Sequence, residues 1–232
     1  ENNNLLYHGA VPLEENGAFA KVRFEGAEYH SVGLMDYCDK MARQGYFAPL
    51  GSPERQRGLD FLWYLWCGPK SPVFGRERMT TFERLFIADK ATHTEKKDSY
   101  YRYTDSETVA RVILTAFGLD PAKSHIINGH VPVRAGRGEK PIKAGGKIIV
   151  IDGGFCKAYQ PQTGIAGYTL VYSSRGLSLR SHQPFETVQK AVRENLDIVS
   201  TVYVFETAKD RLLIGDTDEG RNIREEIAEL RE

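Results

Sequence analysis

Two short histidine segments constrain the fold of this chain more than any other feature. Residues 7–12 read Tyr-His-Gly-Ala-Val-Pro, and residues 128–133 read Asn-Gly-His-Val-Pro-Val. Each segment follows an apolar run typical of a β-strand and sets a histidine beside a glycine. This pattern predicts an imidazole on the loop just past a strand end, where ligands and metals are commonly held. Because His8 and His130 are far apart in the sequence, only a fold that joins two strand ends can bring them together.

The composition is ordinary for a globular protein of one domain or one and a half, with 232 residues, 41% hydrophobic and 27% charged. The 31 Lys and Arg residues balance 31 Asp and Glu residues, so the net charge gives no electrostatic argument for nucleic acid or an anionic membrane. No apolar run approaches the about 20 residues that a membrane helix needs. We therefore expect neither nucleic acid nor a membrane among the partners.

The three cysteines, Cys38, Cys67 and Cys156, are odd in number, widely spaced and form no CxxC pair. This spacing argues against a zinc site built from cysteines. A reducing compartment fits best, so we expect the protein in the cytoplasm. We interpret all three cysteines as buried thiols.

Capping signals and apolar periodicity predict the first three helices. Ser31 is expected to cap a helix that runs to about residue 46, and Ser52 to cap another. The apolar positions of this second helix are Leu59, Leu62, Trp63 and Trp66. A capping box at residues 104–107 is expected to begin a third helix.

The strands predict a mixed architecture. The third helix leads into a strand at residues 124–128, and a fully apolar strand covers residues 147–151. Residues 168–173 and 177–181 are expected to pair as a hairpin, and residues 200–206 form a later strand. Several strands follow one another without an intervening helix, which favours a mixed sheet, or two packed sheets, over a purely parallel one. The chain is therefore assigned to the α/β class.

Two further helices are expected in the C-terminal part. The first opens at Pro184, and its inward positions are Phe185, Val188 and Val192. The second is charged and carries three apolar residues on one side: Ile223, Ile227 and Leu230. Neither helix contains a residue that stands out as a candidate for chemistry.

His8 and His130 are the leading candidates for chemistry. Neutral imidazole is the commonest protein ligand of metals, and a neighbouring glycine leaves room for an ion and its waters. Asp152, at the end of the 147–151 strand, is a third ligand, an orienting group, or a turn residue before two glycines. The alternative for each histidine is a loop residue that the backbone satisfies. No HExxH or GxSxG motif is present.

Two basic loops lie close to these histidines in the sequence. One contains Lys70, Arg76 and Arg78 among glycine and proline, and the other begins with Arg134 directly after the second histidine segment. A guanidinium group binds phosphate through two parallel hydrogen bonds. The alternative is a pair of solvated basic loops. Beside candidate metal ligands in a neutral protein, such loops point to a small phosphorylated substrate.

Five segments of the chain resemble a known family, in the same order. They are residues 4–9 (Asn-Leu-Leu-Tyr-His-Gly) with Pro12, residues 66–72 (Trp-Cys-Gly-Pro-Lys-Ser-Pro) with 74–76 (Phe-Gly-Arg), residues 127–133 (Ile-Asn-Gly-His-Val-Pro-Val), residues 151–155 (Ile-Asp-Gly-Gly-Phe) and residues 182–185 (His-Gln-Pro-Phe). Together they resemble the C-terminal portion of the class III fructose-1,6-bisphosphatases of bacteria, which belong to the calcineurin-like metallophosphoesterase superfamily. The resemblance covers nearly the whole chain.

The resemblance implies that residues 1–232 form the C-terminal part of a calcineurin-like α/β sandwich with mixed sheets and flanking helices. Residues 30–103 would be a helical insertion that bears a substrate-binding loop. The superfamily builds a two-metal site from five sequence blocks, and the last two supply histidines that match His8 and His130, both on the same metal. The first three blocks, DxH, GDxxDRG and GNHD/E, are not found here. We therefore expect a piece of a longer chain, with those ligands in the N-terminal half of the same enzyme.

The resemblance also implies a manganese-dependent phosphoric monoester hydrolase. It would remove the 1-phosphate of fructose 1,6-bisphosphate and yield fructose 6-phosphate in gluconeogenesis. Arg76 is the first choice for stabilising transition-state charge, and substrate binding is assigned to Lys70, Arg76, Arg78 and Arg134. Without the first three blocks, this chain alone is expected to be inactive. The alternatives are a metallophosphoesterase for phosphoproteins or dinucleoside polyphosphates, or a non-catalytic sensing or assembly module, and a homo-oligomer is also open.

Overall fold

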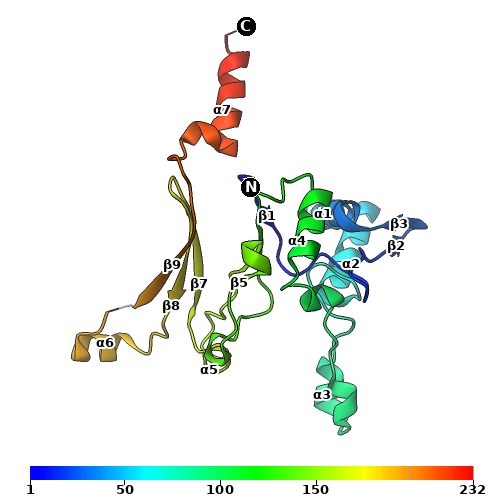
Figure 1. The fold of residues 1–232 in the computed structure, drawn as a ribbon. Coiled ribbons are helices and arrows are strands. Elements are labelled where there is room, and N and C mark those ends of the chain that lie inside the picture. The colour runs from blue at the N-terminus through cyan, green and yellow to red at the C-terminus, as the bar shows by residue number, and fades with distance from the viewer. Residues whose placement is uncertain (198, 232) are drawn as a thin grey trace.

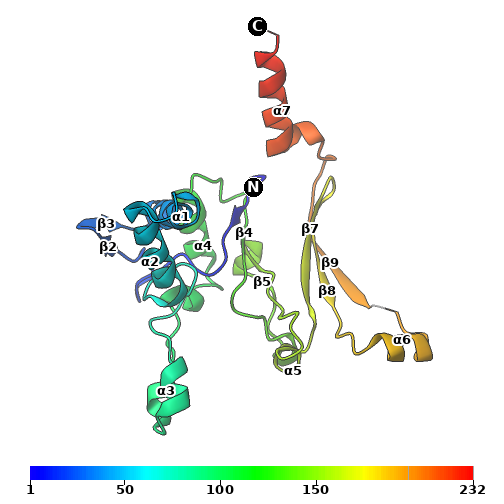
Figure 2. The ribbon, with the colours of Figure 1, turned by 180° about the vertical axis from the view of Figure 1, so that it is seen from behind.

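A four-stranded mixed sheet forms the centre of the computed structural model, which describes residues 1–197 and 199–231 (Figures 1 and 2). In spatial order its strands are β1 (Leu5–Leu6), β4 (Ile126–Asn128), β6 (Ile148–Val150) and β5 (Ile142–Lys143). β1, β4 and β6 are parallel, and β5 runs antiparallel to β6. The α/β class and the mixed sheet predicted from the sequence are therefore confirmed.

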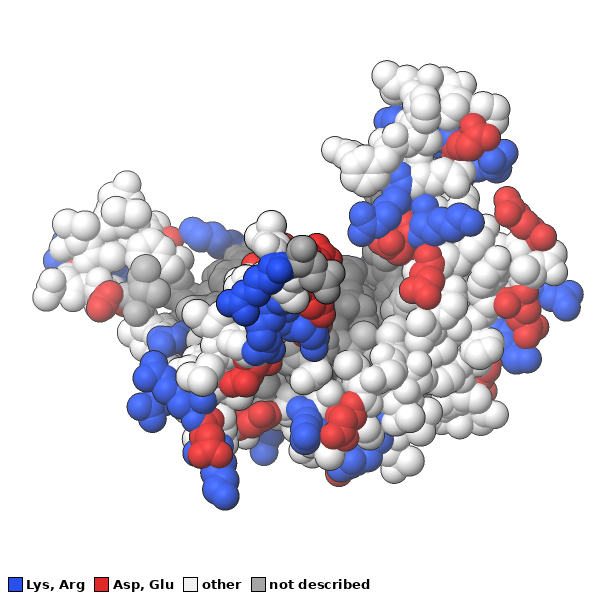
Figure 3. Space-filling model, turned by 90° about the horizontal axis from the view of Figure 1, so that it is seen from above, with Lys and Arg blue, Asp and Glu red and all other residues white. Residues whose placement is uncertain are grey.

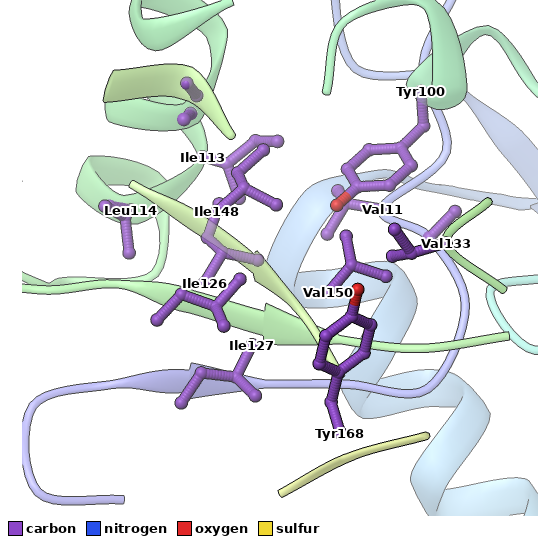
Figure 4. Packing of buried hydrophobic residues seen from close by; sticks show 14 of the residues in the cluster. Val11, Tyr100, Ile113, Leu114, Ile126, Ile127, Val133, Ile148, Val150 and Tyr168 are labelled. Carbon is purple, nitrogen blue, oxygen red and sulfur yellow. The ribbon is translucent and has the colours of Figure 1, made fainter. Parts of the chain in front are cut away.

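The central sheet lies between a helical layer and a second sheet. α4 (Glu107–Ala116) packs Ile113 and Leu114 against the isoleucines of β4 and β6, and β7 (Gly167–Ser173) contributes Tyr168 (Figure 4). Strands covered on both faces are rich in apolar residues, as β6 and the two isoleucines of β4 show. Each fully buried aliphatic side chain contributes about 1.5–3 kcal/mol, so this core holds the strands, and hence their ends, in place.

α4 begins later than the capping box predicted at residues 104–107. Its N-cap is Ser106, whose hydroxyl accepts a hydrogen bond from Val109 N at 3.3 Å. The Thr104 hydroxyl instead donates to Tyr101 O at 3.4 Å, just past a 3-10 helix at Ser99–Arg102. The predicted cap was wrong because the preceding tight turn already uses the threonine.

α1 (Ser31–Phe47) and α2 (Pro53–Cys67) form a helical hairpin beside the central sheet. Ser52 caps α2 as predicted, and its hydroxyl accepts from Arg55 N at 3.1 Å. The cap predicted for α1 was wrong by one residue. His30 occupies the N-cap position, and Ser31 is the first residue of the helix, with a φ of 49°.

The buried face of α2 also differs from the prediction. Phe61 and Leu65 are buried, whereas the four apolar positions that follow the helical period in the sequence are exposed: Leu59, Leu62, Trp63 and Trp66. The two tryptophans are 63% and 56% exposed, so α2 carries a second apolar face toward solvent. Gly58 explains the choice of face, because it shares a stripe with Phe61 and Leu65 and a methyl group there would lie 2.1 Å from Gly45 N of α1.

A narrow arm projects from the body between α2 and α4 (Figure 1). At its base Arg76 and Lys97 form an antiparallel bridge. Its tip holds α3 (Thr81–Phe86) and a 3-10 helix at Lys90–His93. On the other side of α1, β2 (Val22–Phe24) and β3 (Ala27–Tyr29) form a small hairpin.

The second sheet consists of β7 (Gly167–Ser173), β8 (Gly176–His182) and β9 (Ser200–Thr207), all antiparallel. The predicted hairpin and the later strand are thereby confirmed. α6 (Val188–Glu194) and α7 (Asp218–Glu229) extend away from this sheet at opposite ends (Figure 1). The inward packing predicted for the helix after Pro184 is wrong, since its apolar residues are exposed: Phe185, Val188 and Val192.

The surface reflects the balanced composition. Basic and acidic side chains are interspersed over the face of the molecule seen in Figure 3. Within residues 1–197 and 199–231, no helix is long and apolar enough to cross a membrane.

The three cysteines differ in burial. Cys38 is buried within α1, and burial raises the pKa of its thiol to about 12. Cys67 is half-buried at the end of α2, and Cys156 is exposed on the loop after β6. The interpretation of all three as buried thiols is therefore confirmed for Cys38. It was wrong for Cys156, because that loop lies at the surface, and for Cys67, which is only half-buried.

Candidate functional site

His8 and His130 lie side by side at the ends of two adjacent parallel strands. The register pairs Leu6 of β1 with Ile127 of β4, so both loops leave the sheet at the same edge. The Nε2 of His8 is 3.0 Å from the Nδ1 of His130, and Gly129 N donates to the His8 carbonyl at 3.0 Å. The predicted proximity of the two histidines is confirmed.

The protein holds the His130 ring with one nitrogen free of hydrogen. His130 Nε2 lies 2.8 Å from the Phe74 carbonyl, which can only accept, so Nε2 carries the hydrogen and Nδ1 keeps its lone pair. Burial lowers the pKa of His130, and the nearby His8 and Arg76 lower it further against the opposing effects of Phe74 and Asp152. The residue has a φ of 67°, a conformation uncommon outside glycine and found at functional sites. A neutral ring with a bare Nδ1 is the form that binds metals.

The separation of the two rings is that of a hydrogen bond between them, and it is equally compatible with two positions in the coordination shell of one metal ion. Two nitrogens that each lie about 2.1 Å from an ion, at about 90° to one another, are about 3.0 Å apart. The observed separation of 3.0 Å agrees with this value. No cluster of three or more His, Cys, Asp or Glu side chains suited to a metal occurs within residues 1–197 and 199–231. Asp152 instead accepts a hydrogen bond from Gly154 N at 3.0 Å. Of the three roles considered for Asp152 from the sequence, this contact is that of a turn residue.

A buried hydrogen-bond cluster joins the two histidine loops from below. The Tyr100 hydroxyl lies 2.7 Å from the hydroxyl of Tyr7 and accepts from Asn128 Nδ2 at 3.0 Å. The same amide nitrogen donates to Gly9 O at 3.2 Å. Tyr7 precedes His8 and Asn128 begins the His130 segment, so Tyr100, only 1% exposed, fixes one loop against the other.

A third loop packs on the histidine loops and carries Arg76. Ala10 N donates to Pro72 O at 2.9 Å, and the Ser71 hydroxyl donates to Leu65 O and accepts from Phe74 N at 3.2 Å. These bonds shape the turn that presents the Phe74 carbonyl to His130. The same turn leads to Arg76 at the base of the arm.

A cationic cavity of about 250 Å³, here called the phosphate cavity, opens beside His130. Its lining includes Arg76, Lys97, His130, Arg134, Tyr159 and Gln162, the last from α5 (Gln160–Thr163). Burial lowers the pKa of Lys97, and Arg76 and Arg134 add to this effect while Glu139 opposes it. A lysine crowded by two guanidinium groups marks a site suited to an anion. Arg76 also pairs with Glu95 at 3.4 Å, which orients its side chain.

The structure brings two of the four predicted substrate-binding residues, Arg76 and Arg134, into this cavity. The other two make different contacts and do not line it. Lys70 donates to Leu13 O at 2.8 Å and lies 3.5 Å from Asp98, while Arg78 donates to Thr94 O at 3.3 Å within the arm. Lys97 was missed because the segment around it carries no helical or strand period, although the adjacent pair Lys96 and Lys97 was a visible signal.

Strand-end imidazoles beside a cationic cavity, on an α/β core, form a site whose charge suits an anionic ligand. Over residues 1–232 the chain matches the family described as Firmicute fructose-1,6-bisphosphatase, and it belongs to that family.

The curated relatives agree with this assignment. The chain is 53% identical over 230 residues to the class 3 fructose-1,6-bisphosphatase of Clostridium novyi. The matched region is 99% of this chain and 35% of the relative. It is 53% identical to the protein of the same name from Clostridium acetobutylicum over 229 residues, again 99% of this chain and 34% of the relative. The chain thus spans about a third of the length of these relatives. No solved structure matches it.

Proposed function

We propose that this chain supplies two histidine ligands and the phosphate-binding groups of a metal-dependent phosphomonoesterase. In the full-length protein, His8 and His130 would bind the same manganese ion, and the substrate would be fructose 1,6-bisphosphate. The observation that carries the proposal is the 3.0 Å separation of His8 Nε2 and His130 Nδ1 next to the phosphate cavity. The relatives named fructose-1,6-bisphosphatase support the choice of substrate.

The residues of the phosphate cavity would do the electrostatic part of the reaction. A divalent metal ion, when bound, polarises a phosphoryl oxygen and lowers the pKa of water. The Arg76 guanidinium and the Arg134 and Lys97 side chains would hold the phosphate oxygens as negative charge develops on them. Arg76 is the first choice for this role because it lines the cavity and is oriented by Glu95.

The rest of the proposal follows from the family. The remaining metal ligands would come from the N-terminal part of the same enzyme, and residues 1–232 would complete a calcineurin-like sandwich with residues 30–103 as its insertion. Removal of the 1-phosphate would yield fructose 6-phosphate for gluconeogenesis in the cytoplasm.

Phosphate release by the full-length protein tests this function. With manganese, we expect turnover of fructose 1,6-bisphosphate to exceed turnover of a phosphopeptide or a dinucleoside polyphosphate. His130→Ala should abolish turnover, whereas His93→Ala, on the arm, should not. Equal or better hydrolysis of the phosphopeptide by the wild-type protein would replace the proposed substrate, and full activity of His130→Ala would overturn the metal site.

A further inference from the structure

Two adjacent lysines at the base of the arm lie in opposite electrostatic surroundings. Lys96 is exposed and pairs with Glu77 at 2.9 Å and with Glu15 at 3.2 Å. Hydrogen bonds to these two carboxylates raise the pKa of Lys96. Lys97 is half-buried, and burial lowers the pKa of its ammonium group. The two side chains should therefore differ in reactivity, because the neutral amine is the nucleophilic form of lysine.

The Lys97 amine lacks an acidic partner that would keep it protonated. Its Nζ lies 5.6 Å from the centre of the Tyr101 ring, and it forms no ion pair or hydrogen bond within the part of the chain that the structure describes. Glu139 favours the charged form of Lys97, but this carboxylate is already paired with Lys143 at 2.7 Å. A half-buried amine without a carboxylate of its own loses its proton more easily than an exposed, paired one.

Arg76 and Arg134 make the surroundings of Lys97 suitable for a phosphoryl group. Both line the phosphate cavity together with Lys97, and after burial their charges have the largest effects on the pKa of the lysine. Guanidinium groups bind phosphate oxygens through parallel hydrogen bonds. The cavity of about 250 Å³ has room for about eight water molecules at about 30 Å³ each, which is enough for a phosphate that carries a short acyl group.

We propose that Lys97 is a site of covalent acylation by acyl phosphates, the mixed anhydrides of a carboxylic acid and phosphoric acid. The phosphoryl group docks on Arg76 and Arg134, and the Lys97 nitrogen attacks the adjoining carbonyl carbon. A C–N bond forms, and the bond between that carbon and the bridging oxygen breaks. The oxygen keeps the electron pair and leaves as inorganic phosphate, which takes up the proton that the nitrogen loses. The products are an amide and phosphate, with no change in oxidation state.

Acylation would act on the phosphate cavity through charge. The amide is neutral, so the modification removes a cation from the cavity and fills part of it, and phosphate should bind there more weakly. The inference goes beyond the proposed function. It rests on that function only in requiring that the phosphate cavity bind a phosphoryl group.

Acetylation of the full-length protein by acetyl phosphate at neutral pH tests the inference, with no metal added so that the reagent is not hydrolysed. Mass spectrometry measures the initial rates at Lys96 and Lys97, which form a matched pair of neighbours. We expect Lys97 to react about tenfold faster, since one unit of pKa changes the fraction of neutral amine about tenfold. Inorganic phosphate should slow the reaction of Lys97 and leave that of Lys96 unchanged, because it competes for the cavity.

Two controls separate docking of the phosphoryl group from plain nucleophilicity. Acetic anhydride carries no phosphate, so added phosphate should not slow its reaction with Lys97. Arg134→Gln, at an exposed position, should slow acetylation of Lys97 by acetyl phosphate about tenfold without affecting Lys96. Equal rates at the two lysines, or a rate at Lys97 that phosphate does not reduce, would overturn the inference.

The inference and the proposed function fail separately, because acetylation requires no turnover. Selective, phosphate-sensitive acetylation in a protein that does not hydrolyse fructose 1,6-bisphosphate would support the inference and refute the proposed function. Turnover of fructose 1,6-bisphosphate with equal acetylation of Lys96 and Lys97 would do the reverse.

Discussion

Gly9 lies directly against the carbonyl oxygen of Pro72, where an added methyl group would come within 2.4 Å of it. Because that oxygen belongs to the backbone, it cannot rotate away. We expect Gly9→Ala to lower the free energy of unfolding by about 2 kcal/mol. Gly33→Ala, on the open side of α1, meets no atom within 4 Å and should stabilise the protein by up to about 1 kcal/mol. Urea denaturation compares the two, and equal stabilities would contradict the packing of the loops.

Removal of either histidine should weaken metal binding. In the full-length protein, we expect His8→Ala and His130→Ala each to reduce the affinity for manganese by more than about 100-fold, measured by calorimetric titration. His93→Ala should bind as the wild-type protein does. Wild-type affinity in His8→Ala would mean that the two rings do not share an ion.

The 232-residue chain by itself should show no measurable phosphatase activity with added manganese, since His8 and His130 provide only two ligands. Phosphate release from fructose 1,6-bisphosphate is the measurement. Steady turnover that disappears in His130→Ala would refute the expectation and would show that the chain completes a working site alone.

The buried hydroxyl of Tyr100 should be needed for stability. In Tyr100→Phe, Tyr7 loses its hydrogen-bond partner at 2.7 Å and Asn128 loses one acceptor at 3.0 Å. We expect a loss of about 1–3 kcal/mol in the free energy of unfolding, the cost of leaving buried polar groups unpaired. Tyr101→Phe removes a hydroxyl without a described partner and should cost nothing, so a similar loss in both variants would contradict the cluster.

Glu95 should contribute stability that disappears in acid. Burial raises the pKa of its carboxyl, but hydrogen bonds from Thr80 and the charges of Arg76 and Arg84 lower it more, so the net pKa lies below the ordinary value. The contribution is therefore complete above the unfolded pKa of about 4.3 and is lost as pH falls through the folded value.

The unfolded pKa of about 4.3 lies between pH 5 and pH 3. Over this range the free energy of unfolding of Glu95→Gln should therefore fall less than that of the wild-type protein. Thermal unfolding at several pH values provides the measurement. Glu225→Gln, on the exposed α7, should follow the wild-type curve. Parallel curves for the wild-type protein and Glu95→Gln would show that the carboxylate is not held by its partners.

Local chemistry determined the positions of the candidate ligands. Glycine and proline end β1 and β4 directly around His8 and His130, so the sequence alone predicts both imidazoles at strand ends. The Ser52 cap and the β7–β8 hairpin are local in the same sense, because a turn or a helix start depends on a few neighbouring residues. The proximity of the two histidines was predicted from the family resemblance, which implies that both bind the same metal; the parallel pairing of β1 and β4 came from the structure.

Tertiary packing decided the rest. Helical period shows that Trp63 and Trp66 share a face of α2, but only the contact at Gly58 determines that Phe61 and Leu65 are the buried ones. In the same way, Lys97 reaches the phosphate cavity while Lys70 bonds to Leu13. Which lysine lines the cavity depends on the bridge between Arg76 and Lys97, a pairing across the arm that no local sequence pattern predicts. Local patterns thus predict where side chains stand along each element. Which of these side chains meet depends on the packing of distant segments, because such contacts form only where whole surfaces fit together.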